Sequence, residues 1–242
     1  MAHSDEVSQK RHELRGWIAD DDPETAVFAY YLLHHPAGRT RLHLARDARG
    51  QPRGALAECV TGYDLFRPLV TMLADNDEAL RALLRQAMAH NRPCLLLGPL
   101  HYAPVWREMV RIEEEIICRL YVLDRVRFQP IINVLVTRAQ SPEGLPRYEI
   151  RSPEKSLAAA NLNWRSPRFA EVGVRTEPEA RGRRWGESVV SALCAELISA
   201  GITPLYLAEE ENEASRRLAE RVGFRETGRR LLFAPAIWSA GA

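Results

Sequence analysis

The chain has 242 residues, 46% of them hydrophobic, which is enough for one large domain or two small ones with a core. Its formal net charge of +1 argues against nucleic acid as a partner. No apolar run reaches membrane-spanning length and the polar N-terminus lacks a signal-peptide core, so a cytoplasmic protein with no membrane segment is expected.

The first half of the chain predicts two helices, at 8–20 and 23–35, followed by alternating strands and helices. Pro23 after three aspartates is typical of a helix start. Alternating apolar residues and the polar turn at 47–54 predict a hairpin. The predicted elements after residue 40 are strands at 41–46, 55–61 and 69–74, a helix at 77–90, a strand at 94–97, a helix at 103–110 and a strand at 116–123.

The second half repeats part of this order. It predicts strands at 131–137 and 147–151 around a loop at 138–146, a helix at 153–162, a strand at 169–176, a long helix from Trp185 to about Gly201, a strand at 204–208, a shorter helix and a final strand near 225–234. We therefore predict an α/β protein with a mixed sheet and two similarly ordered halves joined around 124–130. The predicted domains are 1–125 and 126–242.

The four cysteines are expected to be reduced. Cys59, Cys94, Cys118 and Cys194 lie far apart, each in or beside an apolar run. This pattern favours buried thiols over a zinc site or disulfides, so no bound metal is expected.

The turn before the long helix has the composition of an anion-binding site. Arg181, Arg183 and Arg184 stand at the helix start, where unpaired N–H groups carry partial positive charge. Gly182 and Gly186 allow a ligand to approach the backbone closely. A pyrophosphate suits this turn, but a solvated basic turn explains the residue types about equally well.

The wider stretch gives the turn a specific interpretation. Residues 175–186 read RTEPEARGRRWG, and the downstream segment contains Asn212, Ser215 and Gly223-Phe224. This stretch resembles motif A of the GNAT acyltransferase superfamily, an R-x-x-G-x-G/A turn after a strand, and is closest to the glycine N-acyltransferase-like branch. Arg181 and Gly186 match the first and last motif positions, whereas the middle glycine is Arg184 here.

The resemblance implies a GNAT fold with acetyl-CoA as co-substrate. It implies that the pyrophosphate lies on 182–187 and that the backbone of 174–176 meets the pantetheine arm and the thioester. Asn212 would bind the pantetheine region, although it suits a helix N-cap equally well. The implied cofactor-binding residues are Val174, Arg175, Thr176, Arg181, Gly182, Arg183, Arg184, Trp185, Gly186, Glu187 and Asn212.

Acyl transfer to an amine needs a base, because an alkylamine is mostly protonated at neutral pH. All seven histidines lie in the first half, which leaves carboxylates and tyrosines in the second. Glu171 is the main candidate base, with Glu209, Glu210 and Glu211 as alternatives, and a salt-bridged or solvated role is an open reading for each. The tyrosine that many GNAT enzymes use as general acid falls at Ala219.

Three further features remain as expectations. Gly173 inside a strand indicates a bulge that would separate the two central parallel strands, or a packing accident. The acceptor pocket is expected to use residues among Asn163, Trp164, Trp106 and His101, while Trp185 is expected in the core. In the first half, 75–78 reads DNDE at the corresponding helix start, so we expect a degenerate copy that binds no phosphate.

Two functions fit these observations. The first is an acyl-CoA-dependent N-acyltransferase that moves an acetyl group to a primary amine of a small molecule, an amino acid or a protein. The second is a non-catalytic acyl-CoA-binding sensor or regulatory protein, which the residues at positions 184 and 219 keep open. A nucleotide-binding module is disfavoured, because the chain has neither a P-loop nor G-x-G-x-x-G.

Overall fold

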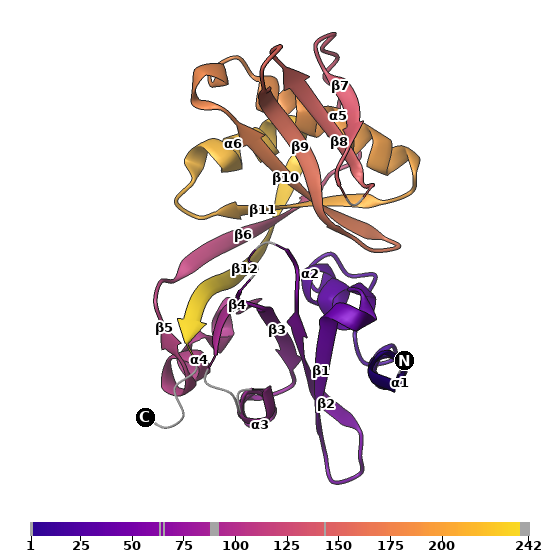
Figure 1. Ribbon diagram of the computed structural model, residues 1–242, viewed down its shortest axis with the longest axis vertical. Helices are drawn as coiled ribbons and strands as arrows, with labels where there is room; N and C mark the ends of the chain where they lie inside the picture. Colours follow the sequence, from indigo (N-terminus) through magenta and orange to yellow (C-terminus); the bar gives the residue numbers. More distant parts are fainter. Residues whose placement is uncertain (1, 63, 65, 88–91, 143, 238–242) are drawn as a thin grey trace. The chain divides into compact units, whose positions relative to one another are not determined.

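The computed structural model describes residues 2–62, 64, 66–87, 92–142 and 144–237 (Figure 1). The chain forms two compact units, Met1–Cys118 with Arg230–Ala242, and Arg119–Arg229. The predicted division into domains at 125/126 stays a prediction.

The first unit begins with helical segments and continues into a sheet. Its helical segments are α1 (Ala2–Leu14), α2 (Ala26–Ala29), a π-helical turn (Tyr30–His34), 3₁₀ turns at Ala37–Arg39 and Leu100–Tyr102, α3 (Asp77–Ala87) and α4 (Ala103–Met109). Its strands are β1 (Thr40–Arg46), β2 (Pro52–Cys59), β3 (Leu69–Ala74), β4 (Pro93–Pro99) and β5 (Arg111–Ile112). The strand order is β1-β2-β3-β4-β12, and β5 also pairs with β12.

The second unit carries the turn that the sequence singles out. Its strands are β7 (Thr137–Gln140), β8 (Pro146–Arg151), β9 (Ser156–Arg165), β10 (Phe169–Thr176) and β11 (Thr203–Glu209), together with β6 (Ile116–Leu123) and β12 (Phe224–Ile237), which are shared with the first unit. Its helices are a 3₁₀ turn (Pro178–Ala180), α5 (Trp185–Ser199) and α6 (Glu213–Val222). The strand order is β12-β6-β11-β10-β9-β8-β7.

The same arrangement recurs in both units. In the first, β1, β2 and β3 are antiparallel neighbours, and β4 follows α3 to lie parallel to β3. In the second, β8, β9 and β10 are antiparallel neighbours, and β11 follows α5 to lie parallel to β10. The mixed α/β sheet and the repeated order agree with the sequence analysis.

The last strand of each half pairs within the other unit. β6 follows α4 in sequence, yet it stands between β12 and β11 in the strand order. β12 follows α6, yet Leu231–Ile237 pair antiparallel with residues 93–99 of β4. The two halves therefore exchange their final strands.

Each unit has its own hydrophobic core. In the first, α3 and α4 contribute Leu80, Leu83 and Trp106 to a cluster with β2, β3, β4 and β12. In the second, the predicted apolar stripe of α5 packs on the sheet, and Val189, Val190, Leu193 and Cys194 are fully buried. None of the four cysteines is joined in a disulfide; Cys59, Cys94 and Cys194 are buried, and Cys118 is partly accessible.

Two predicted elements of the second half are wrong. The predicted helix at 153–162 is instead the strand β9, because Ala158, Ala159 and Ala160 are buried and pack within the sheet, where their small side chains let α5 approach. Burial thus overrides the helix propensity of alanine. The predicted strand at 131–137 is also wrong, since only Thr137 belongs to a strand.

Residues 131–136 lie alongside α5 and do not pair with a strand. The Ile131 N–H donates to Ser191 Oγ at 2.8 Å, and Asn133 Nδ2 donates to Ser188 Oγ at 3.1 Å. Ile132 and Val134 are 92% and 94% exposed, so their hydrophobicity does not mark a buried strand. The loop predicted at 138–146 is also shorter than expected, because its first residues belong to β7.

The first predicted helix is displaced. α1 spans Ala2–Leu14 rather than 8–20, because Gly16 disfavours continuation and the polar residues before position 8 fold helically around the buried Val7. The second predicted helix holds over Ala26–His34, with a π-helical second part. Positions 88–90 of the predicted helix at 77–90 lie outside the described residues, and α3 ends at Ala87.

Candidate functional site

The turn between β10 and α5 leaves the first N–H groups of the helix without a side-chain cap. After the 3₁₀ turn Pro178–Ala180 the chain takes positive φ at Gly182 (76°) and Arg184 (58°), and α5 begins at Trp185. The first helical bond runs from the Ser188 N–H to the Arg184 oxygen, and no side chain caps the helix. The N–H groups of 185–187 therefore form the open positive end of a helix of 15 residues.

The three arginines of the turn differ in their pairing. Arg184 Nη2 lies 2.7 Å from Glu187 Oε2, and Arg221 of α6 lies 3.1 Å from Glu187 Oε1. The Glu187 carboxylate, with a side chain only 5% exposed, thus offsets the charge of Arg184 and joins α5 to α6. Arg181 and Arg183 are exposed, and Arg183 stacks over the Trp185 ring at 4.9 Å.

The Arg184 backbone explains the departure from the motif. Its left-handed conformation is the one that glycine adopts most easily, and Arg184 is the only described non-glycine residue with positive φ. The chain therefore places an arginine in a backbone conformation that favours glycine. The pair with Glu187 holds this arginine in place.

Gly186 is required by close packing. A Cβ at this position would lie 2.9 Å from Leu218 Cδ1 and 3.0 Å from Thr176 Oγ1. At Gly186 the start of α5 thus contacts both the end of β10 and α6. This contact brings the backbone of 174–176 beside the turn, which is the arrangement that the predicted cofactor-binding residues require. Trp185 is half-buried and packs against the core of the second unit.

The two parallel strands of the second unit separate after a short paired stretch. β10 pairs with β11 only through Phe169–Glu171, although both strands continue beyond this point. The register between β10 and β9 shifts between Glu171 and Val172, which leaves Asn163 as the extra residue on β9. A Cβ at Gly173 would lie 2.8 Å from Asn163 Oδ1, so Gly173 packs closely against this side chain, whereas the bulge lies on β9 at Asn163 and not at Gly173 as expected.

Glu171 is buried and held by two donors where the strands separate. Asn163 Nδ2 donates to Oε1 and the indole N–H of Trp164 donates to Oε2, each at 2.6 Å. Glu171 is 8% exposed, and burial raises the pKa of its carboxyl group although both hydrogen bonds oppose this. A carboxyl group with a raised pKa is suited to accept a proton near neutral pH.

Trp164 has a different place from the one expected. It lies on β9 rather than in a loop, is 1% exposed, and orients Glu171 instead of lining an open pocket. Trp106 is fully buried in the core of the first unit. Asn163 and His101 have exposed surface. No local sequence pattern links Trp164 to Glu171, since the cross-strand register creates the pair.

β11 and α6 add a second polar group to this region. The Tyr206 hydroxyl and Ser215 Oγ lie 2.9 Å apart, and Tyr206 is 2% exposed. Burial, and to a smaller degree the nearby charge of Glu171, raises the pKa of Tyr206, although the bond to Ser215 opposes this. Tyr206 was not among the predicted site residues, because a tyrosine in a buried strand is most often a core residue.

The remaining predicted residues are placed as follows. Asn212 caps α6 through a bond from the Ser215 N–H to Oδ1 at 3.0 Å. Ala219 is fully buried, so no hydroxyl stands at the position of the family's tyrosine. Glu209 and Glu211 are exposed, whereas Glu210 pairs with Arg119. Glu210 is thereby a weaker candidate base than Glu171.

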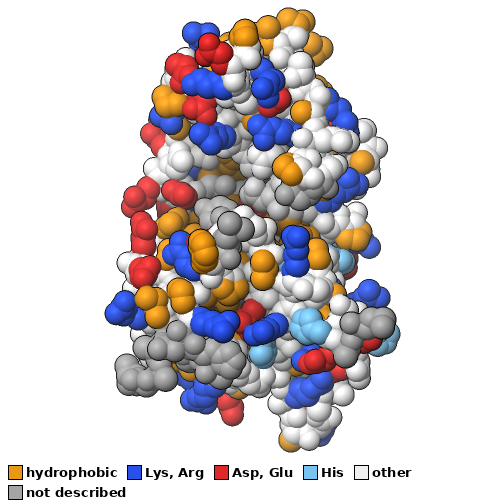
Figure 2. Space-filling view, in the orientation of Figure 1, with side chains coloured by type: hydrophobic (Ala, Val, Ile, Leu, Met, Phe, Trp, Pro, Cys, Tyr) orange, Lys and Arg blue, Asp and Glu red, His pale blue; other side chains and the backbone are white. Residues whose placement is uncertain are grey.

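The described residues show neither a metal-binding cluster nor a membrane-spanning helix. They contain no group of three or more His, Cys, Asp or Glu that could hold a metal ion. Among the helices they form, none has the length and apolarity needed to cross a bilayer. Basic, acidic and apolar side chains are interspersed over the face drawn in Figure 2.

Comparisons with known proteins agree with this geometry. The family model described as FR47-like protein matches residues 154–232, which hold β10, the basic turn, α5, β11 and α6. No curated protein sequence matches the chain.

Solved structures resemble the chain over most of its length. A GCN5-related N-acetyltransferase-like protein from Streptococcus suis is 14% identical, with a TM-score of 0.59, and covers 93% of this chain and 99% of its own. A GCN5-related N-acetyltransferase from Kribbella flavida is 15% identical, with a TM-score of 0.58 and coverage of 90% and 96%. A tandem GNAT protein from the clavulanic acid biosynthesis pathway is 14% identical, with a TM-score of 0.58 and coverage of 90% and 89%. The chain has the GNAT fold.

Proposed function

We propose that the chain is an acyl-CoA-dependent N-acyltransferase that moves an acetyl group from acetyl-CoA to a primary amine. The observation that carries this proposal is the uncapped, arginine-flanked start of α5 beside separated parallel strands. The likeness of residues 154–232 to the FR47-like model and the GNAT fold support it. The acceptor would be a small molecule, an amino acid or a protein amino group.

The cofactor would bind along the end of β10 and the turn. The pyrophosphate would accept hydrogen bonds from the N–H groups of 182–187, with Arg181 and Arg183 adding charge. The backbone of 174–176, which pairs with β9 but not with β11, would meet the pantetheine arm, and Asn212 would face it while capping α6. Since β10 and β11 separate after Glu171, an acyl group fits between them without breaking a ladder bond.

The chemistry would proceed by direct attack of the amine on the thioester. Glu171, through its raised pKa and its position where the strands separate, would remove a proton from the ammonium group or from the attacking nitrogen. A backbone N–H of β10 would stabilise the oxyanion. The leaving thiolate has a conjugate acid of pKa about 8.5, so it departs with little help although position 219 is alanine.

A charge-reversal variant tests the phosphate site. Arg181→Glu with Arg183→Glu should weaken acetyl-CoA binding at least about tenfold, because charge-assisted bonds contribute roughly 1.5–3 kcal/mol each. Isothermal titration measures this, and Arg225→Glu, an exposed arginine of β12 away from the turn, is the matched control. An unchanged affinity in the double variant would remove the proposed site.

A non-catalytic acyl-CoA sensor is the second candidate function. Ala219, which leaves the general-acid position without a hydroxyl, favours it. Release of free thiol from acetyl-CoA, measured against a panel of primary amines, separates the two functions. Turnover that falls at least about a hundredfold in Glu171→Gln with unchanged acetyl-CoA affinity supports the enzyme, whereas saturable binding without thiol release for every amine supports the sensor.

The first unit would be a degenerate copy of the second. The shared strand and helix order supports this inference. Its α3 begins with Asp77 and Glu78, and acidic side chains at a helix start repel a phosphate. We accordingly propose that one acyl-CoA binds per chain and that titration gives a stoichiometry of about one.

A further inference from the structure

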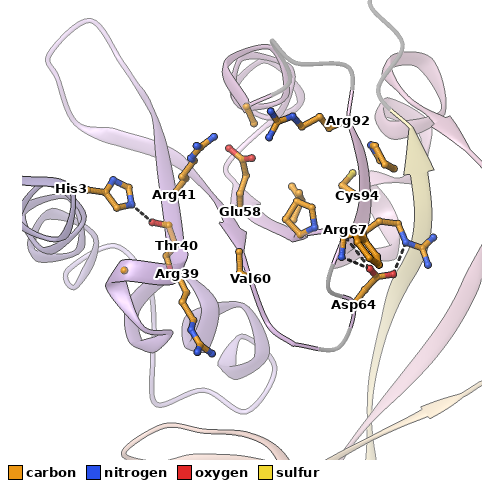
Figure 3. Close-up of a pocket in the computed structure, with 16 residues that line it drawn as sticks. His3, Arg39, Thr40, Arg41, Glu58, Val60, Asp64, Arg67, Arg92 and Cys94 are labelled. Carbon is orange, nitrogen blue, oxygen red and sulfur yellow. Dashed lines mark hydrogen bonds and ion pairs between the residues drawn. The ribbon is translucent and has the colours of Figure 1, made fainter.

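The first unit contains a cavity of about 540 Å³, which lies within the usual range for small-molecule sites. It is lined by β1, β2, the loop before β3 and the start of β4 (Figure 3). Pro68 and Pro93 place it at the beginning of the parallel strands β3 and β4. The turn that corresponds to the proposed acyl-CoA site follows the end of β3, so the cavity is a different site.

Cationic side chains outnumber carboxylates in the lining of the cavity, and not all of them form ion pairs. Arg41 stands opposite Glu58 across the β1–β2 pair, but Glu58 binds His43 Nε2 at 2.8 Å instead. In Figure 3 the guanidinium groups of Arg41 and Arg92 flank the Glu58 carboxylate. Neither forms an ion pair with any residue that the structure describes, whereas Arg67 is paired with Asp64 at 2.7 Å.

Apolar side chains complete the cavity. Phe66 and Val60 line it and are 90% and 52% exposed, although large apolar side chains are normally covered. Cys94 lines the inner wall and is 4% exposed, and burial raises the pKa of its thiol to about 12. The thiol is therefore neutral and adds to the apolar surface.

We propose that this cavity binds a small organic anion. A carboxylate or phosphate group lies against Arg41 and Arg92, and the hydrocarbon part of the ligand covers Val60 and Phe66. The two free guanidinium groups supply paired donors for a planar or tetrahedral anion. Glu58, whose Oε1 lies 2.8 Å from His43 Nε2, carries a single negative charge, so it does not neutralise both arginines.

Isothermal titration of the full chain tests the proposal with benzoate and phenyl phosphate as probes. At least one of them should bind saturably at millimolar concentration or below, and the tighter of the two identifies carboxylate or phosphate as the preferred group. Benzamide, which has the same ring without the charge, should bind at least about tenfold more weakly. Failure of both anions to bind, or equal binding of benzamide, overturns the proposal.

Variants locate the binding. Arg41→Gln with Arg92→Gln should weaken the anion at least about tenfold, while Arg85→Gln, an exposed arginine of α3 outside the cavity, should leave it unchanged. Circular dichroism and the urea midpoint show that each variant is folded. Unchanged binding in a folded double variant, or inorganic phosphate binding as tightly as phenyl phosphate, contradicts the assignment. Acetyl-CoA affinity should be retained in the double variant, which separates this site from the proposed function.

Discussion

The two units contain the same turn from a strand into a helix, but the side chains at this turn have opposite charges. In the first unit β3 leads through Asp75 and Asn76 into α3, and the Asn76 side chain accepts the Ala79 N–H at 2.9 Å. In the second, β10 leads into α5 through a turn with exposed arginines and no side-chain cap. One helix start is capped by a side chain of its own chain, and the other has no side-chain cap.

We propose that this difference gives an anion site to one unit and denies it to the other. Backbone topology alone provides the helix start in both units, since the strand, helix and parallel strand recur in the same order. Whether that start attracts or repels a phosphate depends on a few side chains at the first turn. The predictions below test the comparison between units, from the largest expected effect to the smallest.

The largest effect on stability is expected for Trp164→Phe in the second unit. This change leaves Glu171 Oε2 without its indole donor, which should cost about 1–3 kcal/mol beyond the loss of ring volume. Trp106→Phe in the first unit is the matched control, because its buried indole N–H has no hydrogen-bond partner among the described residues. Urea unfolding of both variants gives the difference, and equal losses would contradict the role of the Trp164 bond.

A second comparison uses pH, because one buried group in each unit titrates with opposite sign. Burial lowers the pKa of His35 from 6.5 to about 4, so its contribution to stability is present above pH 6.5 and is lost as the pH falls toward 4. Burial raises the pKa of Glu171 above 4.5, so its contribution is present below pH 4.5 and is lost as the pH rises through the folded value.

Urea unfolding at pH 7 and pH 4 measures both contributions. Relative to His35→Gln, the wild type should lose up to about 3 kcal/mol between pH 7 and pH 4. Relative to Glu171→Gln, the wild type should gain stability over the same interval. A wild-type curve that moves in the same direction against both variants would show that one of the two assignments is wrong.

The smallest effect is expected for Arg184→Gly. Glycine removes the cost of the left-handed backbone, about 1–2 kcal/mol, and loses an ion pair whose arginine is 68% exposed and worth about 0–1 kcal/mol. Stability should change by less than about 2 kcal/mol, and acetyl-CoA affinity by little, since Glu187 already offsets this charge. Calorimetric titration and urea unfolding check both, and a large loss of affinity would mean that Arg184 contacts the cofactor directly.

The sequence predicts the structure best where the hydrophobic period and the capping or turn residues indicate the same element. The stretch from β10 through α6 has a clear apolar stripe, a glycine after α5 and an asparagine cap, and the structure has each element there. The same is true of β3 and β6, whose bounds match the predicted strands. The basic turn and the close packing at Gly173 could be predicted because the residues concerned are adjacent in sequence. The same holds for the separation of the strands.

The failures have a tertiary cause. The alanines at 158–160 favour a helix locally, and only packing under α5 makes β9 a strand. The register that brings Trp164 to Glu171 depends on an extra residue, Asn163, between strands. Similarly, the pairing of Glu187 with Arg221 joins two helices, so the sequence around the turn could not show this ion pair.

The exchange of final strands has a consequence for biosynthesis. β4 receives its second neighbour only when residues 231–237 have left the ribosome. Until then the nascent N-terminal half exposes one edge of that strand, a surface that invites association with other chains. The core of the first unit, to which Leu232, Ala234 and Ala236 of β12 contribute, is therefore completed only after residues more than a hundred positions downstream of β4 have been synthesised.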